Sequence, residues 1–81
     1  MNLKFSIHFQ QAIVERNISI DHLKKTIRNP DTLHQSFGGR IIATKVVDDK
    51  MLEVVYIESV MSKSKKEYQI ITAYYILNKW K

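Results

Sequence analysis

The chain has no cysteine, only two glycines and only one proline among its 81 residues. Without cysteine, neither a disulfide framework nor a thiolate metal site can supplement the core, so packing must hold the fold together. The low glycine and proline content, together with 44% hydrophobic residues, is typical of a globular domain. A chain of this length buries only roughly 60% of its unfolded surface, which is too little for two separate cores. We therefore expect one domain over residues 1–81.

Long apolar runs are also missing from the sequence. No uninterrupted apolar stretch approaches the roughly 20 residues that span a bilayer, and the opening MNLKFSIHFQQ lacks the apolar core of a signal peptide. We therefore expect no membrane partner and a cytoplasmic location. Thirteen Lys and Arg against eight Asp and Glu give a formal charge of +5. That balance fits RNA, an acidic protein segment or solubility alone.

Two short helices are predicted in the first third of the chain. Ser6 is placed to cap a helix over residues 7–17, and Asn17 is placed to end it in a short turn. Ser19 begins a second helix, which Pro30 stops. Both segments repeat apolar side chains every three or four positions, in the first as Phe9, Ala12 and Ile13 and in the second as Ile20, Leu23 and Ile27. The other face of the second helix is basic.

After the second helix the pattern becomes that of strands. Three segments are rich in Val, Ile, Thr and Tyr and are predicted as strands: 40–48, 51–60 and 67–77. Residues 31–37 add a shorter edge strand, with Gly38 and Gly39 as the turn that follows. A tight turn at 48–50 and a longer charged connection at 61–66 make the pairings antiparallel. We expect an α+β domain with two N-terminal helices on an antiparallel meander of three or four strands.

The last strand carries apolar residues on both of its alternate faces. Simple alternation places Tyr68, Ile70, Tyr74 and Ile76 on one face and Ile71, Ala73, Tyr75 and Leu77 on the other. A sheet with one solvated face would instead alternate apolar with polar residues. We therefore expect the helices to cover one face and the other face to be partly used for contacts.

The residues of several common functional sites are absent or wrongly spaced. His8, His22 and His34 lie on three different segments without a carboxylate at an i, i+4 offset, so we expect no metal site. The pair Gly38 and Gly39 lacks the further glycine and the lysine of a phosphate-binding loop. Neither a serine nucleophile elbow nor a catalytic carboxylate pair is recognisable. We expect no cofactor.

What remains is a basic and aromatic set that suits RNA cleavage without a metal: His8, Arg16, Lys45, Tyr56, Thr72 and Tyr74. In that chemistry a base removes the 2′-hydroxyl proton, an acid protonates the leaving oxygen, and cations stabilise the charge on the phosphate. His8 and Arg16 are about 12 Å apart along a helix, so they would have separate roles. Each residue also has a structural interpretation, as a local hydrogen-bond donor, a surface ion-pair partner or a packed strand residue. On physical grounds alone we favour that interpretation.

Residues 8–19, HFQQAIVERNIS, resemble the pattern H-A-x-x-R-M-x-x-R-G-I-S of a widespread family of small domains of unknown function. The residues that match in register are His8, Arg16, Ile18 and Ser19. Further similarities are the helix ending in Asn29-Pro30, the Gly39-Arg40 pair and the segments 52–55 and 70–74. The resemblance covers nearly the whole chain. Two positions depart from the pattern, because Ala12 replaces its first arginine and Asn17 replaces its glycine.

This family is similar to the BrnT-like and RelE-like ribonuclease toxins, which pack N-terminal helices on an antiparallel sheet and cleave RNA without metal. The resemblance implies four catalytic residues that converge on an exposed part of the sheet: His8, Arg16, Thr72 and Tyr74. Strand alternation and the basic helix face add four candidate substrate-binding residues: Lys45, Tyr56, Lys24 and Arg28.

Three functions follow from these patterns. The first is a toxin-like, metal-independent endoribonuclease restrained by an antitoxin protein. The second is a noncatalytic basic module that binds RNA or an acidic protein partner. This function is favoured by Ala12, which stands in place of an arginine that could bind phosphate. The third is a structural protein that forms a homodimer through a sheet edge.

Overall fold

A computed structural model describes residues 2–63 and 65–77. Its helices are α1 (Ile7–Glu15) and α2 (Ile20–Arg28), with a short 3-10 turn η1 (Phe37–Gly39). Five strands complete the described chain: β1 (Asn2–Phe5), β2 (Thr32–Gln35), β3 (Arg40–Val47), β4 (Lys50–Ser62) and β5 (Lys65–Leu77). The α+β class and both helices agree with the sequence-based prediction.

Both helices begin at the serines that the sequence indicates. The Ser6 hydroxyl accepts a hydrogen bond from the Phe9 amide at 3.0 Å, and the Ser19 hydroxyl accepts one from the His22 amide at 3.3 Å. Each bond satisfies one amide that the first helical turn leaves without a backbone partner. The second helix ends at its C-cap, directly before Pro30. These local predictions are confirmed.

The end of α1 is a left-handed turn at Asn17, which has φ of 54°. The Ile18 amide donates to the Ile13 carbonyl at 2.9 Å, and the Asn17 amide donates to the Val14 carbonyl at 3.2 Å. These two bonds form a Schellman motif, in which a residue with positive φ ends the helix. The turn brings Ile18 into the core, where it is buried.

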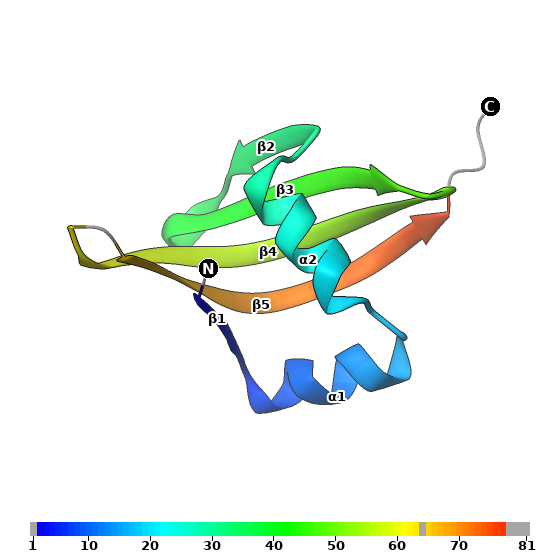
Figure 1. Ribbon diagram of the computed structural model, residues 1–81, viewed down its shortest axis with the longest axis horizontal. Helices are drawn as coiled ribbons and strands as arrows, with labels where there is room; N and C mark the ends of the chain where they lie inside the picture. Colours follow the sequence, from blue (N-terminus) through cyan, green and yellow to red (C-terminus); the bar gives the residue numbers. More distant parts are fainter. Residues whose placement is uncertain (1, 64, 78–81) are drawn as a thin grey trace.

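The sheet is mixed, with strand order β1-β5-β4-β3-β2 (Figure 1). Its first strand pairs in parallel with β5, whereas the other three pairings are antiparallel. The predicted antiparallel meander of three or four strands is therefore wrong in strand number and order. A run of four residues is too short to show a periodic pattern, and its partner lies more than sixty positions later, at residues 67–70.

The turns between strands follow the predictions in two places out of three. Gly38 and Gly39 take φ of 70° and 75° in the turn after β2, a conformation that suits glycine. A two-residue turn joins β3 to β4, since Val47 pairs with Lys50. The predicted long connection at 61–66 is wrong, because both strands continue and Ser62 pairs with Lys65. The cross-strand hydrogen bonds of this charged segment extend the hairpin.

A β-bulge interrupts the pairing of β4 with β5. Val55 pairs with Thr72 and Tyr56 pairs with Ile70, so Ile71 is the extra residue on β5. The prediction of simple alternation along this strand is therefore wrong beyond the bulge. One face now carries Tyr68, Ile70, Ala73 and Tyr75, and the other carries Gln69, Thr72, Tyr74 and Ile76.

The core lies between the helices and one face of the sheet. In Figure 1, α2 crosses in front of the sheet, where it contacts β3 and β4, and α1 lies beside β5. The residues that fill the interface are Phe9, Ile18, Leu23, Ile27, Ala43, Val47, Leu52, Val54, Tyr56, Ile70 and Ala73. No described element covers the opposite face, which carries half-buried apolar residues such as Ile42, Val55 and Ile57. Neither helix of the described chain is long and apolar enough to cross a membrane.

Truncation of one core leucine should strongly destabilise this fold. Leu23 on α2 is fully buried, whereas Leu33 on β2 is 55% exposed. We expect Leu23→Ala to lower the free energy of unfolding by about 2–5 kcal/mol, because it removes apolar contacts and leaves a cavity. The matched change Leu33→Ala should cost less than about 0.5 kcal/mol. Urea denaturation measures both, and equal losses would contradict the assignment of Leu23 to the core.

Candidate functional site

The predicted site residues on the sheet lie on two opposite faces. Lys45 and Tyr56 share the helix-covered face, as alternation from a two-residue hairpin turn predicts. Thr72 and Tyr74 lie on the open face, because the bulge reverses the alternation of β5. The sheet therefore separates the two pairs, and these four side chains do not converge on one surface.

Arg16 and Thr72 are predicted catalytic residues that the fold brings into contact. The Arg16 Nη1 donates to the Thr72 hydroxyl at 3.4 Å and to the Ala73 carbonyl at 2.9 Å. The last β5 residue that pairs with β1 is Ile70, so β5 has no neighbouring strand on that side at Ala73. Arg16 thus satisfies a carbonyl at an open sheet edge, a structural role that also protects the edge from pairing with other chains.

His8 stands apart from this contact. Its side chain is exposed near the start of α1, and the helix places it about 12 Å from Arg16 along the axis. A general base must lie within hydrogen-bond reach of the proton that it removes. His8 and the Arg16–Thr72 pair would therefore contact different parts of an extended substrate.

The two predicted tyrosines have hydrogen bonds or packing that keep them protonated. The Tyr74 hydroxyl donates to the Glu53 carboxylate across the β4–β5 pair, and this bond, with partial burial and the Glu53 charge, raises the pKa of Tyr74. Burial raises the pKa of Tyr56, with smaller contributions from Glu58 and Tyr68. Both phenols suit hydrogen-bond donation at neutral pH, and neither suits the role of general base.

Lys45 has a structural partner. Its Nζ lies 3.7 Å from one oxygen of Asp31, and its side chain is only 21% exposed. The other Asp31 oxygen accepts a hydrogen bond from the Val46 amide at 2.8 Å. Asp31 therefore connects the segment before β2 to β3, and Lys45 supports that connection.

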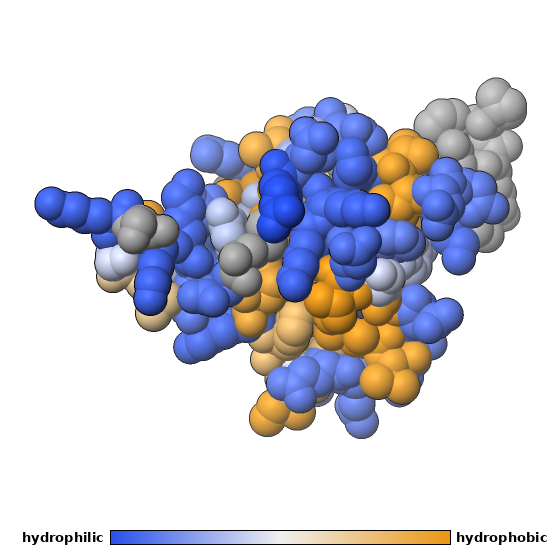
Figure 2. Space-filling model, viewed as in Figure 1, coloured by the Kyte–Doolittle hydropathy of each residue, from blue (hydrophilic) through white to orange (hydrophobic). Residues whose placement is uncertain are grey.

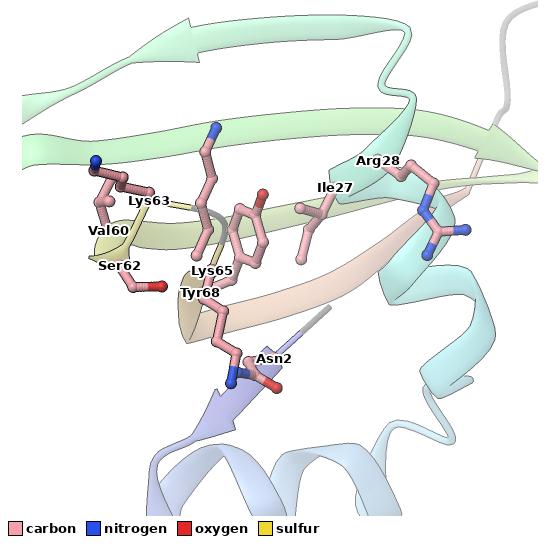
Figure 3. Close-up of a pocket in the computed structure, with 9 residues that line it drawn as sticks. Asn2, Ile27, Arg28, Val60, Ser62, Lys63, Lys65 and Tyr68 are labelled. Atoms are coloured by element: carbon pink, nitrogen blue, oxygen red, sulfur yellow. The ribbon is translucent and has the colours of Figure 1, made fainter.

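A basic groove lies on the helix-covered face between the end of α2 and the β4–β5 hairpin (Figure 3). Its volume is about 710 Å³, and its lining residues are Asn2, Ile27, Arg28, Val60, Ser62, Lys63, Lys65, Lys66 and Tyr68. Four of these nine are cations and none is a carboxylate. Among them, Arg28 is a residue that the sequence predicts to bind substrate. Lys24, the other such residue on α2, is exposed and lies one helical turn before Arg28.

The cations of the basic groove differ in their partners. Lys66 lies 3.0 Å from the Glu58 carboxylate, and the hydrogen bond between them raises the pKa of Lys66. Within the described chain, no carboxylate lies within 4.0 Å of Arg28, Lys63 or Lys65. Three cations of the groove are thus available to an anionic ligand. The lysine-rich hairpin is evident in the sequence, but its position beside α2 depends on the tertiary fold.

The sequence does not reveal a second cluster, which joins α2 to the end of β5. The His22 Nδ1 and the Tyr75 hydroxyl are 2.9 Å apart, and the Ser19 amide donates to the same hydroxyl at 3.2 Å. The Nε2 of His22 lies 3.8 Å from Asp48, and the Lys50 ammonium lies 5.1 Å from the centre of the Tyr75 ring. These contacts fix the start of α2 on the sheet, and they depend on the bulge that turns Tyr75 toward the helices.

The described residues do not form a metal centre. No group of three or more His, Asp or Glu side chains within residues 2–63 and 65–77 is arranged to hold a metal ion. His22 and Asp48 lie 3.8 Å apart, and the other ring nitrogen of His22 contacts the Tyr75 phenol. Cationic and phenolic side chains therefore dominate both clusters.

Comparisons with protein-family models, curated proteins and solved structures found no match to this chain. The resemblance to the RelE-like toxins therefore stays a prediction.

The stability of the protein should depend on the ionisation of its tyrosines at high pH. A pKa that is raised in the folded state contributes stability that is complete below the unfolded pKa and is lost as the pH rises through the folded pKa. We therefore expect the free energy of unfolding to fall above pH 10.0, the ordinary tyrosine pKa, because the shifts at Tyr56, Tyr74 and Lys66 act in the same direction.

Tyrosinate absorbance during a pH titration checks the main cause of the shift at Tyr74. In Glu53→Gln the carboxylate that accepts the Tyr74 hydrogen bond is replaced by a neutral amide, which is a weaker acceptor and carries no charge, so the pKa of Tyr74 should move down toward 10.0. The Tyr74→Phe variant identifies which step of the titration belongs to this residue. An unchanged Tyr74 step in Glu53→Gln would contradict the assignment of the shift to the carboxylate.

Proposed function

We propose that this protein binds RNA through the basic groove. The observation that carries the proposal is that Arg28, Lys63 and Lys65 line one concave surface whose lining has no carboxylate. Phosphate groups attract such cations, and the release of counterions from the nucleic acid supplies much of the binding free energy. Arg28 adds a planar guanidinium group that can donate two parallel hydrogen bonds to a phosphate.

The surroundings of the groove support the same ligand. Lys24 extends the positive surface along α2, and Figure 2 shows hydrophilic side chains over α2 and the hairpin end of the sheet. The formal charge of +5 favours long-range attraction of a polyanion. An acidic protein segment could also pair with these cations. The half-buried Tyr68 ring in the groove, however, suits stacking with a nucleobase. RNA therefore accounts for more of the lining than an acidic peptide does.

Metal-independent RNA cleavage, in a cytoplasmic toxin restrained by an antitoxin, is a second candidate function. The contact between Arg16 and Thr72 favours it, because two residues of the RelE-like pattern meet there. Arg16 would stabilise phosphate charge, and His8 would transfer a proton at another part of the substrate. We rank RNA cleavage below RNA binding for two reasons. His8 lies far from Arg16, and Ala12 stands where the family pattern has an arginine.

Loss of Arg28 should weaken RNA binding more than loss of a matched arginine elsewhere. Arg40 begins β3 on the open face, so Arg40→Ala removes the same charge from the other side of the sheet. We expect Arg28→Ala to weaken binding roughly tenfold, or about 1.4 kcal/mol, and to reduce the slope of log K against log salt by about one. Fluorescence anisotropy with labelled RNA over a salt series measures both quantities.

The same measurement separates the alternatives. Equal effects of Arg28→Ala and Arg40→Ala would show that the charge acts without the groove and would sink the proposed site. Competition by polyglutamate as strong as that by RNA of equal charge would favour an acidic protein partner instead.

The cleavage candidate requires product, which binding alone does not give. We expect RNA incubated with the protein in EDTA to yield 2′,3′-cyclic phosphate ends, and His8→Ala and Arg16→Ala to lower the rate at least about tenfold each. Because Arg16 also holds the β5 edge, its variant must first show an unchanged thermal unfolding midpoint. His8 is exposed and needs no such check. Equal background cleavage by all three proteins would exclude the catalytic roles.

A further inference from the structure

We propose that the basic groove takes one unstacked base of single-stranded RNA, with the Tyr68 ring as the surface on which the base stacks. This inference rests on the proposed RNA binding and adds which form of RNA the groove selects. Three features of the groove support it, namely the packing of the ring against Tyr56, the combination of apolar and cationic side chains in the lining, and the size of the space.

The Tyr68 ring packs against a second aromatic ring on the same face of the sheet. Tyr56, which is only 3% exposed, packs edge-on against it with ring centres 5.7 Å apart and planes at 70°. Figure 3 shows the Tyr68 ring standing in the groove, with Ile27 on one side and the hairpin lysines on the other. A ring fixed in this way loses little conformational entropy when a base stacks on it.

The lining combines apolar and cationic side chains (Figure 3). Ile27, Val60 and Tyr68 supply apolar surface, whereas Arg28 comes from α2 and Lys65 comes from the hairpin. A nucleotide has the same combination, because its base is largely apolar on its faces and its phosphates are charged. A site for phosphate alone would gain nothing from the apolar residues, so the combination favours a whole nucleotide.

The size of the groove matches this ligand. Its volume of about 710 Å³ falls within the range of about 300–1,000 Å³ that holds small organic ligands in proteins. In duplex RNA the bases are stacked on one another and paired, and the helix presents mainly ribose and phosphate to a protein. A duplex would therefore contact the cations but could not place a base against Tyr68. Single-stranded RNA should bind more tightly than a duplex of the same length.

A comparison of three probes on the unmodified protein tests this inference. The probes are oligouridine of about ten nucleotides, within the site sizes of small single-strand binding modules, a duplex of equal length, and an abasic strand of equal charge. We expect oligouridine to bind at least about tenfold more tightly than the abasic strand, the effect of one stacked base. Equal affinities for oligouridine and the abasic strand would overturn the base pocket.

Two substitutions at one position assign the effect to the ring. Tyr68→Phe retains the aromatic face and should bind oligouridine like the unmodified protein. Tyr68→Leu should weaken oligouridine binding about tenfold and leave abasic binding unchanged, which also shows that the variant is folded. Loss of both ligands in Tyr68→Leu would overturn the stacking role.

The failures of the two proposals are distinguishable. If all three probes bind equally and respond to Arg28→Ala more than to Arg40→Ala, the base pocket is wrong and RNA binding at the groove stands. If no probe responds to Arg28→Ala more than to Arg40→Ala, the groove is not the RNA site and both proposals fail.

Discussion

The extra residue at Ile71 is the constraint on which the arrangement of the helices against the sheet depends. Because the bulge reverses the alternation of β5, Ile70 and Ala73 both face the core although they are three residues apart. Tyr75 then meets α2, and the adjacent stretch of β5 presents its edge to Arg16. Without the bulge, Ala73 and Tyr75 would face solvent and α2 would lose its anchor. One inserted residue therefore determines which β5 side chains enter the core and which side chain meets α2.

Features that depend on neighbouring residues could be predicted from the sequence. Ser6 and Ser19 cap the helices because each hydroxyl reaches an amide three positions later. Asn17 ends α1 because asparagine tolerates positive φ. Features that depend on distant residues could not be predicted in this way. The bulge is a shift in the pairing register of β5 with β4, and no composition signal distinguishes Ile71 from the other apolar residues of that strand.

The candidate site follows the same division. Arg28 could be assigned to a basic helix face from the pattern of α2 alone, and the lysines of the hairpin are visible as a charged run. The position of these residues around Tyr68 could not be predicted from the sequence, because it depends on how the β4–β5 hairpin lies beside α2. The predicted site residues of the sheet lie on two faces for the corresponding reason, since strand alternation without the bulge would put Thr72 and Tyr74 on the same face as Tyr56.

The parallel pairing of β1 with β5 has a consequence for how the molecule assembles. Residues 2–5 meet residues 67–70, so this contact closes a loop of nearly the whole chain, and such contacts form late because the closure entropy is lost before the pairing can compensate it. Asn2 belongs to the basic groove. One wall of the groove is therefore completed only when the rest of the sheet has folded, so a partly synthesised or partly unfolded chain lacks the complete groove.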